Sequence, residues 1–212
     1  DFTPVQFPAD RVDARTITTH FDFDAMHDTI LKLDILGHSD PTMLKMLGDL
    51  TGVDVRTIPM RDEKVMSLFH STEALGLPAG RSPAASATLG LPEMGTFMAR
   101  DMIRETRPGR VYDVIQLMGL SHGTDVWKGN AQDLIQSGTC SLEDVIGCRD
   151  SIMTTLIYKG LPSKMAFDIM ESVRRGRGLK PDQEAMMQEK GVPAWYIGSC
   201  KKICYLFPKA HA

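Results

Sequence analysis

The stretch LKLDILGHSDP (residues 31–41) marks the point where the sequence changes from a strand-like to a helix-like pattern. Its first part is an apolar run that stops at a glycine, which predicts a buried strand over Leu31–Leu36. Its last part is typical of a helix start, with Asp40 as the N-cap and Pro41 in the first turn. Apolar residues then recur at helical spacing over residues 42–50. We therefore expect short strands before residue 40 and helices after it.

Asp34 is a carboxylate in the middle of this apolar run, and burying a carboxylate is costly unless something pairs with it. Lys32 lies two residues earlier, so strand alternation places both side chains on one face. One interpretation is an ion pair at the end of a strand. The other is a ligand for a catalytic metal ion, with Lys32 supporting the carboxylate or a phosphate. The run alone leaves both interpretations open.

The remaining pattern predicts a mainly α chain. His20–Phe23 is expected to form a short strand, and the residues 76–95, which are rich in Gly, Pro, Ala and Ser, are expected to form a long loop. The expected helices are Thr42–Leu50, Arg61–Phe69, Thr96–Arg104, Tyr112–Gly119, Asn130–Gln136, one opening at Ser141, Asp150–Lys159, Ser163–Arg174, Asp182–Lys190 and Trp195–Phe207.

Composition narrows the class of protein. The 212 residues are 42% apolar, which suffices for a core, and no apolar run is long enough for a membrane span. No segment resembles a signal peptide, and four Cys without a CxxC pair indicate reduced cytosolic thiols rather than a zinc site. The first residue is Asp, and the last six look like the entry to a helix, so we expect a fragment of a longer protein.

Charge is divided unevenly along the chain. Residues 159–211 hold ten Lys or Arg against five Asp or Glu, a local charge of +5, so the remainder of the net −3 is −8. This asymmetry indicates either a basic surface for a polyanion or simply well-solvated helices.

The segment VRRGRG (residues 173–178) places three Arg and two Gly at an expected helix end. Guanidinium groups bind phosphate oxygens in pairs, and glycine lets the backbone approach a ligand closely. Arg174 and Arg175 are therefore candidate phosphate ligands. Charge complementarity at the C-terminal end of a helix is the competing explanation.

The segment GLSHGTDVW (residues 119–127) is expected to be a polar loop. Ser121, His122 and Asp125 suggest a hydrolase triad, but three residues this close in sequence do not readily converge as triad members do. Turn-stabilising hydrogen bonds are one interpretation. Contact with a nucleotide through Ser121, His122 or Trp127 is the other.

Three further basic residues are weaker candidates for an anion site. Arg149 precedes an expected helix, and Lys209 and His211 follow Pro208, where a further helix could offer backbone N–H groups to an anion.

Six blocks of sequence together resemble one known family. They are THFDF (19–23), LKLDILGH (31–38), STEALG (71–76), GLSHGTDVW (119–127), VIGCRD (145–150) and FPKAHA (207–212). In this order they resemble the PolC-type alpha subunit of bacterial DNA polymerase III, a family C replicative polymerase.

The resemblance implies a fold, an activity and a set of site residues. Residues 1–40 would be the C-terminal part of a nucleotidyltransferase-like palm, and residues 41–212 an all-helical fingers domain, truncated at its C-terminal end. Asp34 stands where the family has the third of three palm Asp residues that hold two Mg²⁺ ions. The fingers residues would bind the incoming nucleotide: Arg174 and Arg175, and less specifically Arg149, Lys209, His211, Ser121 and His122.

The same resemblance implies partners and a location. The full-length protein would be a DNA-directed DNA polymerase that uses two Mg²⁺ ions, primer–template DNA and deoxynucleoside triphosphates in the cytoplasm, at the nucleoid. The sliding clamp and other replisome subunits would bind parts that this chain lacks. Because two of the three metal ligands are missing, the isolated chain is expected to be inactive. The alternative is a non-catalytic helical module that binds nucleic acid or a protein.

Overall fold

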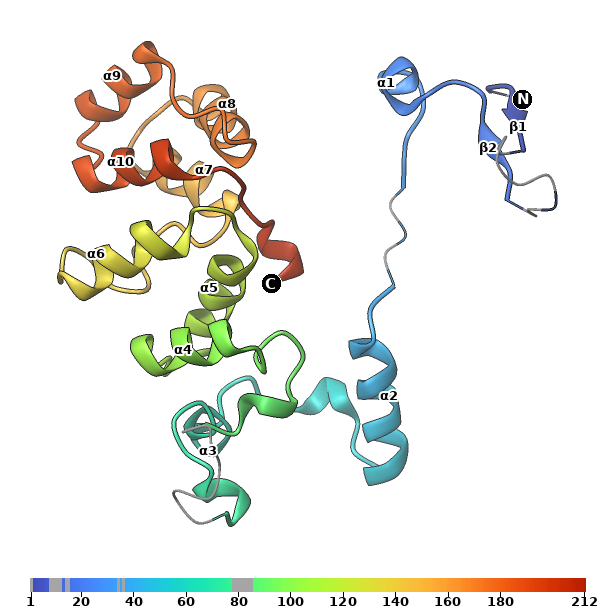
Figure 1. The fold of residues 1–212 in the computed structure, drawn as a ribbon, viewed down its shortest axis with the longest axis vertical. Helices are drawn as coiled ribbons and strands as arrows, with labels where there is room; N and C mark the ends of the chain where they lie inside the picture. The colour runs from blue at the N-terminus through green and yellow to red at the C-terminus, as the bar shows by residue number, and fades with distance from the viewer. Residues whose placement is uncertain (1, 8–12, 14–15, 34, 36, 78–85) are drawn as a thin grey trace. The chain divides into compact units, whose positions relative to one another are not determined.

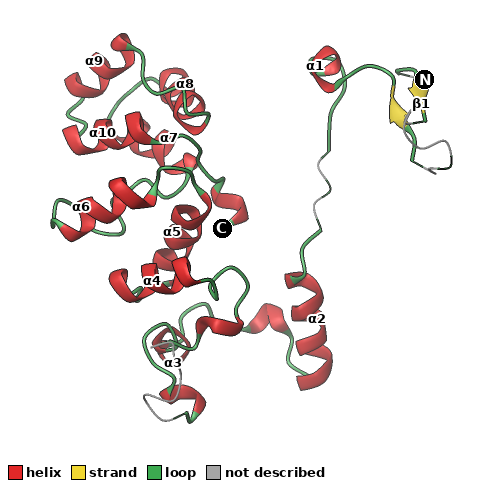
Figure 2. Cartoon of the chain, in the orientation of Figure 1, coloured by secondary structure: helices red, strands yellow, loops and turns green. Residues whose placement is uncertain are grey.

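The computed structural model describes residues 2–7, 13, 16–33, 35, 37–77 and 86–212. They form two compact units, residues 1–56 and residues 57–212, which are treated separately below (Figure 1). Figure 2 shows that the secondary structure is mainly helical, which confirms the predicted class. Within the described part of the chain, no helix is both long enough and apolar enough to span a membrane.

The first unit contains a two-stranded sheet and two helices. Strand β1 (Val5–Gln6) pairs antiparallel with β2 (Thr18–Thr19), with Val5 opposite Thr19. Helix α1 (Phe23–Met26) follows Asp22, whose side chain accepts a hydrogen bond from the Ala25 N–H at 2.8 Å. The predicted strand over His20–Phe23 is therefore wrong, because Asp22 caps a helix there.

Helix α2 (Asp40–Thr51) confirms the helix start at residues 40–41. Ser39 occupies the N-cap position instead of Asp40, and Pro41 lies in the first turn as predicted. The helix ends at Gly52, whose φ of 72° is a left-handed conformation that glycine adopts without strain.

The predicted buried strand over Leu31–Leu36 is wrong for the residues of that run that the structure describes. Leu31, Leu33 and Ile35 have no regular secondary structure, and they are 82%, 75% and 96% exposed. Alternating apolar residues fit a strand only where a neighbouring strand receives them, and β1 and β2 pair with each other. Asp34 itself lies outside the described residues.

The second unit is an array of helices (Figure 1). Its α-helices are α3 (Glu63–Ser67), α4 (Phe97–Thr106), α5 (Val111–His122), α6 (Gln132–Gln136), α7 (Arg149–Tyr158), α8 (Ser163–Arg174), α9 (Pro181–Glu189) and α10 (Ala194–Lys202). Short 3₁₀ turns lie at Glu73–Leu75, Thr88–Gly90 and Lys209–His211, a further one at Val55–Thr57 straddles the boundary of the two units, and a kinked π-type turn lies at Trp127–Ala131.

One hydrophobic core holds these helices together. Helix α8 buries a stripe at the i, i+3, i+4, i+7 spacing of an amphipathic helix, from Ala166 through Val173, and α7 contributes the fully buried Ile152 and Leu156. Burying one such aliphatic side chain contributes about 1.5–3 kcal/mol relative to exposure. Packing, more than helix propensity, therefore fixes where α7 and α8 lie.

Three predictions for this unit are wrong: the end of one helix, the existence of a second and the end of a third. Helix α5 continues through His122, so the expected loop at Gly119 begins later. The helix expected to open at Ser141 does not form: the Ser141 N–H and hydroxyl donate to Asp144 Oδ2, at 3.0 Å and 2.6 Å, and these bonds close a turn. Helix α10 ends at Lys202, because the following residues form hydrogen bonds with other parts of the unit.

Candidate functional site

The C-terminal segment, residues 203–212, brings the predicted fingers residues together. Its backbone is hydrogen-bonded to the loop after α5, to the end of α8 and to the start of α7. These bonds run from the Thr124 N–H to the Tyr205 carbonyl (3.0 Å), from the Leu206 N–H to the Arg174 carbonyl (3.4 Å), and from the Arg149 N–H to the Phe207 carbonyl (3.1 Å). Three elements that are distant in sequence therefore meet along one segment.

A glycine makes one of these contacts possible. Gly176 has a φ of 68°, and a Cβ atom at this position would lie 2.6 Å from the Cys204 carbonyl oxygen. That distance is shorter than any ordinary contact, so a side chain here would push the segment away from the end of α8. The glycine of the VRRGRG motif thus serves backbone packing within the protein.

Glu171 is the centre of an arginine cluster, which we define as Arg149, Arg174 and Arg175 around this carboxylate. Two nitrogen atoms of Arg174 donate to Glu171, with the Nη2–Oε2 distance at 2.8 Å, and Arg175 Nη2 lies 3.0 Å from Oε2. The hydrogen bond from Arg174 lowers the pKa of Glu171 more than burial raises it. The positive charges of Arg174, Arg175 and Arg149 lower this pKa further.

The cluster holds three positive charges and one negative charge, so it is a net cationic site. Its members differ in accessibility: the side chain of Arg174 is 23% exposed, and that of Arg175 is 48% exposed. Arg174 therefore stabilises the end of α8 as well as carrying charge, in agreement with the competing helix-end explanation. Arg175 has more surface available for a ligand.

Ser121 and His122 form a local hydrogen-bonded group at the end of α5. The Ser121 hydroxyl lies 2.9 Å from the Met118 carbonyl oxygen and 2.9 Å from His122 Nδ1, and Nδ1 lies 2.7 Å from the same carbonyl. A carbonyl only accepts, so Nδ1 carries the hydrogen and is not a base for Ser121. The other ring nitrogen faces Glu93 Oε2 at 3.2 Å, and not Asp125. This geometry excludes the triad and agrees with the turn-stabilising interpretation.

Phe207 connects this group to the last basic residues. Its ring stacks on His122 with centroids 4.6 Å apart and contacts His211 edge-on at 5.9 Å. Lys209 Nζ lies 5.2 Å from the centre of the Tyr112 ring, a cation–π distance. Candidate residues from α5 and from the C-terminal segment thus lie on one contiguous surface.

One of the backbone donors expected to serve an anion after Pro208 is paired within the protein. The Lys209 N–H donates to Asp150 Oδ2 at 2.7 Å, and the turn at Lys209–His211 is a single 3₁₀ turn. A carboxylate already occupies the donor that an anion would use.

Trp127, the aromatic candidate of the loop, is only 4% exposed and belongs to the hydrophobic core. The sequence pattern did not indicate four neighbours of the candidate residues, which are Glu171, Glu93, Tyr112 and Phe207. Glu171 could have been found, because it lies three and four residues before Arg174 and Arg175, the spacing of ion pairs on one helix face. The other three depend on long-range packing that no local pattern encodes.

The described residues do not supply a metal centre. Among them, no group of three or more His, Cys, Asp and Glu side chains is placed to hold an ion. Lys32 Nζ lies 4.7 Å from the centre of the Phe23 ring. The predicted metal ligand, Asp34, is outside the described part of the chain.

Comparison with known proteins gives a consistent result. The family model described as the bacterial DNA polymerase III alpha subunit finger domain matches residues 40–192. The chain is 58% identical over all 212 residues to a DNA polymerase III PolC-type of Listeria welshimeri. The corresponding identities are 55% for the protein of Bacillus subtilis and 54% for that of Staphylococcus aureus, and the chain spans 15% of the length of each. The chain therefore belongs to the bacterial DNA polymerase III alpha subunit finger-domain family and is similar to its PolC type.

Proposed function

We propose that this chain is the fingers region, preceded by the end of the palm, of a replicative DNA-directed DNA polymerase, and that the arginine cluster binds the triphosphate of the incoming nucleotide. The observation that carries the proposal is the contact of two guanidinium groups, Arg174 and Arg175, with the carboxylate of Glu171, whose pKa the nearby charge of Arg149 also lowers. The match of the finger-domain model from residue 40 supports a palm–fingers boundary near that residue.

The chemistry of the cluster suits a polyphosphate. A triphosphate carries several negative charges, and arginine binds its oxygen atoms with paired hydrogen bonds. Hydrogen bonds to the C-terminal segment fix the backbone of Arg149 and of Arg174, and Glu171 holds the Arg174 guanidinium in place before a ligand arrives. Charges fixed in advance stabilise the negative charge that develops on the leaving group at little reorganisation cost.

The surface around Phe207 would complete the nucleotide site. In this proposal Lys209 and His211 contact the phosphates or sugar, and Ser121 and His122 contact the nucleotide or fix the position of Phe207. The Ser121 hydroxyl and the His122 ring are already hydrogen-bonded to Met118. Their part is therefore positioning through Phe207 at least as much as direct contact.

For Asp34 the proposal rests on the sequence alone. We propose that it is one ligand for the two Mg²⁺ ions of the full-length enzyme, with Lys32 in support, since Mg²⁺ prefers carboxylate oxygens. Asp34→Asn in the full-length enzyme is expected to preserve folding and to lower turnover by several orders of magnitude. Single-turnover incorporation within about tenfold of the parent, or about 1.4 kcal/mol, would show that Asp34 is structural.

The full-length enzyme would act on primer–template DNA at the bacterial nucleoid, in the cytoplasm, and would bind the sliding clamp and other replisome subunits through its other regions. A helical module that only binds nucleic acid or a protein is the alternative. Titrating the chain with a deoxynucleoside triphosphate, with and without Mg²⁺, separates the two. We expect saturable binding that Arg175→Ala weakens, and no primer extension by the isolated chain. Nucleotide binding that is absent, or that ignores this substitution, would favour the interaction module.

A further inference from the structure

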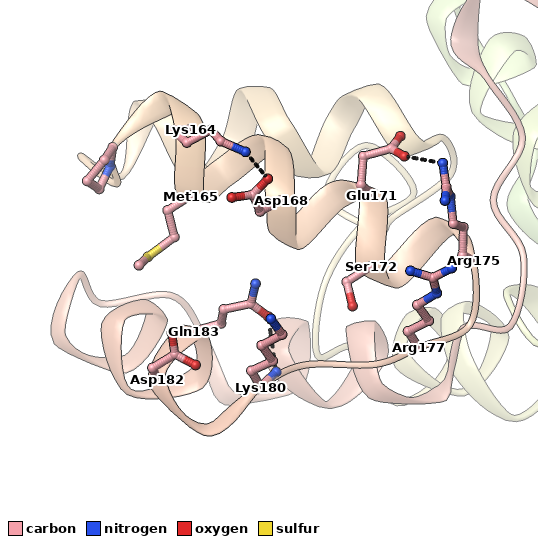
Figure 3. A pocket seen from close by; sticks show the side chains of 11 residues that line it. Lys164, Met165, Asp168, Glu171, Ser172, Arg175, Arg177, Lys180, Asp182 and Gln183 are labelled. Carbon is pink, nitrogen blue, oxygen red and sulfur yellow. Dashed lines mark hydrogen bonds and ion pairs between the residues drawn. The ribbon is translucent and has the colours of Figure 1, made fainter. Parts of the chain in front are cut away.

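A pocket of about 730 Å³ lies between α8 and α9, on the side of α8 that carries Lys164, Asp168, Glu171 and Arg175 (Figure 3). These residues recur at the three- and four-residue spacing of one helix face. The opposite wall comes from the Arg177–Gln183 segment and the first turn of α9. The pocket shares Arg175 with the arginine cluster and extends away from it along α8.

The backbone that carries Arg177 is fixed on both sides. The Arg177 N–H donates to the Ser172 carbonyl at 3.0 Å, and the Ser172 hydroxyl donates to the Gly178 carbonyl at 2.9 Å. Gly176 and Gly178 both have a φ of 68°, which lets the chain turn tightly around Arg177. Hydrogen bonds to α8 therefore fix the backbone from which the Arg177 side chain extends.

The charges that line the pocket are only partly paired. Lys164 pairs with Asp168 at 2.6 Å, and Arg175 with Glu171 at 3.0 Å. Within the part of the chain that the structure describes, neither Arg177 nor Lys180 has a carboxylate within ion-pair distance. Figure 3 shows Arg175 and Arg177 at one end of the pocket and Asp182 at the other. The end with Arg177 is thus cationic.

An aromatic ring lies next to the pocket without lining it, beside the lining residue Lys164. Phe167 is 45% exposed, and Lys164 Nζ lies 5.9 Å from the centre of its ring. At 1.5 Å of helix rise per residue, Phe167 and Arg175 are about 12 Å apart along the axis of α8. In a stacked strand each nucleotide advances about 3.4 Å along the axis, so this distance corresponds to about three or four nucleotides.

We propose that the α8–α9 pocket binds the unpaired template strand ahead of the primer terminus, with Arg177 and Lys180 on its phosphates and a base stacked on Phe167. The combination of unpaired cations with an exposed ring is what single-stranded nucleic acid requires. A single inorganic phosphate or a free nucleotide would use one end of the pocket only. This inference rests on the proposed polymerase function.

The test uses the full-length polymerase and fluorescently labelled primer–template duplexes. Overhangs of zero and about two, four and eight nucleotides are compared, because the distance from Phe167 to Arg175 along α8 matches about three or four nucleotides. The variants are Arg177→Ala, Lys180→Ala and Phe167→Ala. Lys128→Ala serves as the matched control, since Lys128 is exposed in the same unit and does not line the pocket. Thermal melting of each variant verifies folding, and Arg177→Lys tests whether charge alone suffices.

In the parent enzyme, affinity should rise as the overhang grows to about four nucleotides and then level off. Phe167→Ala should weaken binding of the duplex with an overhang about tenfold relative to the blunt duplex. Arg177→Ala and Lys180→Ala should each make the dependence of log affinity on log salt shallower by about 0.7. Lys128→Ala should change neither quantity, and the affinity for nucleoside triphosphate should stay at the parental value in all four alanine variants.

Two results would overturn the inference. One is an equal loss of affinity for the blunt duplex and for the longest overhang. The other is displacement of the overhang by a free mononucleotide at parental affinity, which would identify the pocket as a nucleotide site. A parent enzyme that neither binds nor extends any primer–template would instead refute the proposed polymerase function.

Discussion

Arg174 and Arg175 are neighbours in sequence, but the structure predicts that their substitutions have different effects. Arg174 makes two hydrogen bonds to Glu171, and the side chains of both residues are about three-quarters buried, at 23% and 24% exposure. Arg175 makes one contact to the same carboxylate from a side chain that is 48% exposed. We therefore expect Arg174→Ala to act mainly on stability and Arg175→Ala mainly on nucleotide binding.

The magnitudes follow from the contacts. A hydrogen-bonded charge pair contributes about 1.5–3 kcal/mol, and the two bonds from the one Arg174 side chain form a single, partly solvent-exposed pair with Glu171. We expect it to lower the free energy of unfolding by about 2 kcal/mol. The exposed ion pair of Arg175 is worth about 0–1 kcal/mol of stability. If Arg175 holds a triphosphate oxygen, its loss weakens nucleotide affinity by about ten- to a hundredfold.

Two assays separate these effects. Urea denaturation of the 212-residue chain gives the free energy of unfolding for each variant, with Lys128→Ala as a surface control. Nucleotide titration of the full-length enzyme gives the affinity. Equal losses of stability in the two variants would contradict these different roles. So would an Arg175→Ala variant with parental nucleotide affinity whose stability falls by more than about 1 kcal/mol.

Two further predictions concern titration and thiol chemistry. The hydrogen bond from Arg174 and the charges of neighbouring Arg residues lower the pKa of Glu171. Burial raises the pKa of Asp113, but hydrogen bonds from Arg110 and from the nearby backbone lower it more. Each carboxylate stabilises the fold above its ordinary pKa of about 4, and this contribution disappears as the pH falls through the lowered value. The urea concentration at the unfolding midpoint should therefore decrease as the pH is lowered below about 4.5, and Asp113→Asn should make this decrease smaller. An equal decrease in Asp113→Asn and the parent would contradict the assignment. Burial raises the pKa of Cys148 to about 11 and that of Cys200 to about 12. These two thiols should therefore react with a disulfide reagent at pH 8 only when the chain unfolds. Equal reaction rates for all four thiols of the folded chain would refute this.

The helices that the sequence predicted well are those whose apolar stripe is both regular and buried. Ser163–Arg174 was predicted with the observed bounds, because its stripe spans one complete face and Gly176 follows its end. The helix expected from Ser141 failed, since a capping pattern specifies a hydrogen bond and not the turns that would continue it. The strand expected at Leu31–Leu36 failed because alternation does not supply a partner strand.

The candidate site, too, could be predicted only in part from the sequence. The basic residues could be named from the sequence as phosphate candidates, because guanidinium groups beside glycine suit a phosphate, although helix-end charge complementarity gives the same pattern. Their common partner, Glu171, could also have been predicted, because helix spacing places it beside Arg174 and Arg175. Their other neighbours could not be predicted from the sequence. Phe207 meets His122 only because residues 203–212 leave the helix pattern after Lys202 and bond to three other elements. That path depends on long-range contacts, which periodicity does not report.

Arg149 offers the most direct test that the arginine cluster binds the incoming nucleotide. Within the described chain its side chain has no ion pair of 4 Å or less, so its removal should cost little stability. The measurement is single-turnover incorporation by full-length Arg149→Ala, titrated with nucleotide and, separately, with primer–template. We predict an apparent Kd for nucleotide that is raised about tenfold or more, with an unchanged Kd for DNA. A parental nucleotide Kd in a folded variant would contradict the assignment of the cluster to the triphosphate.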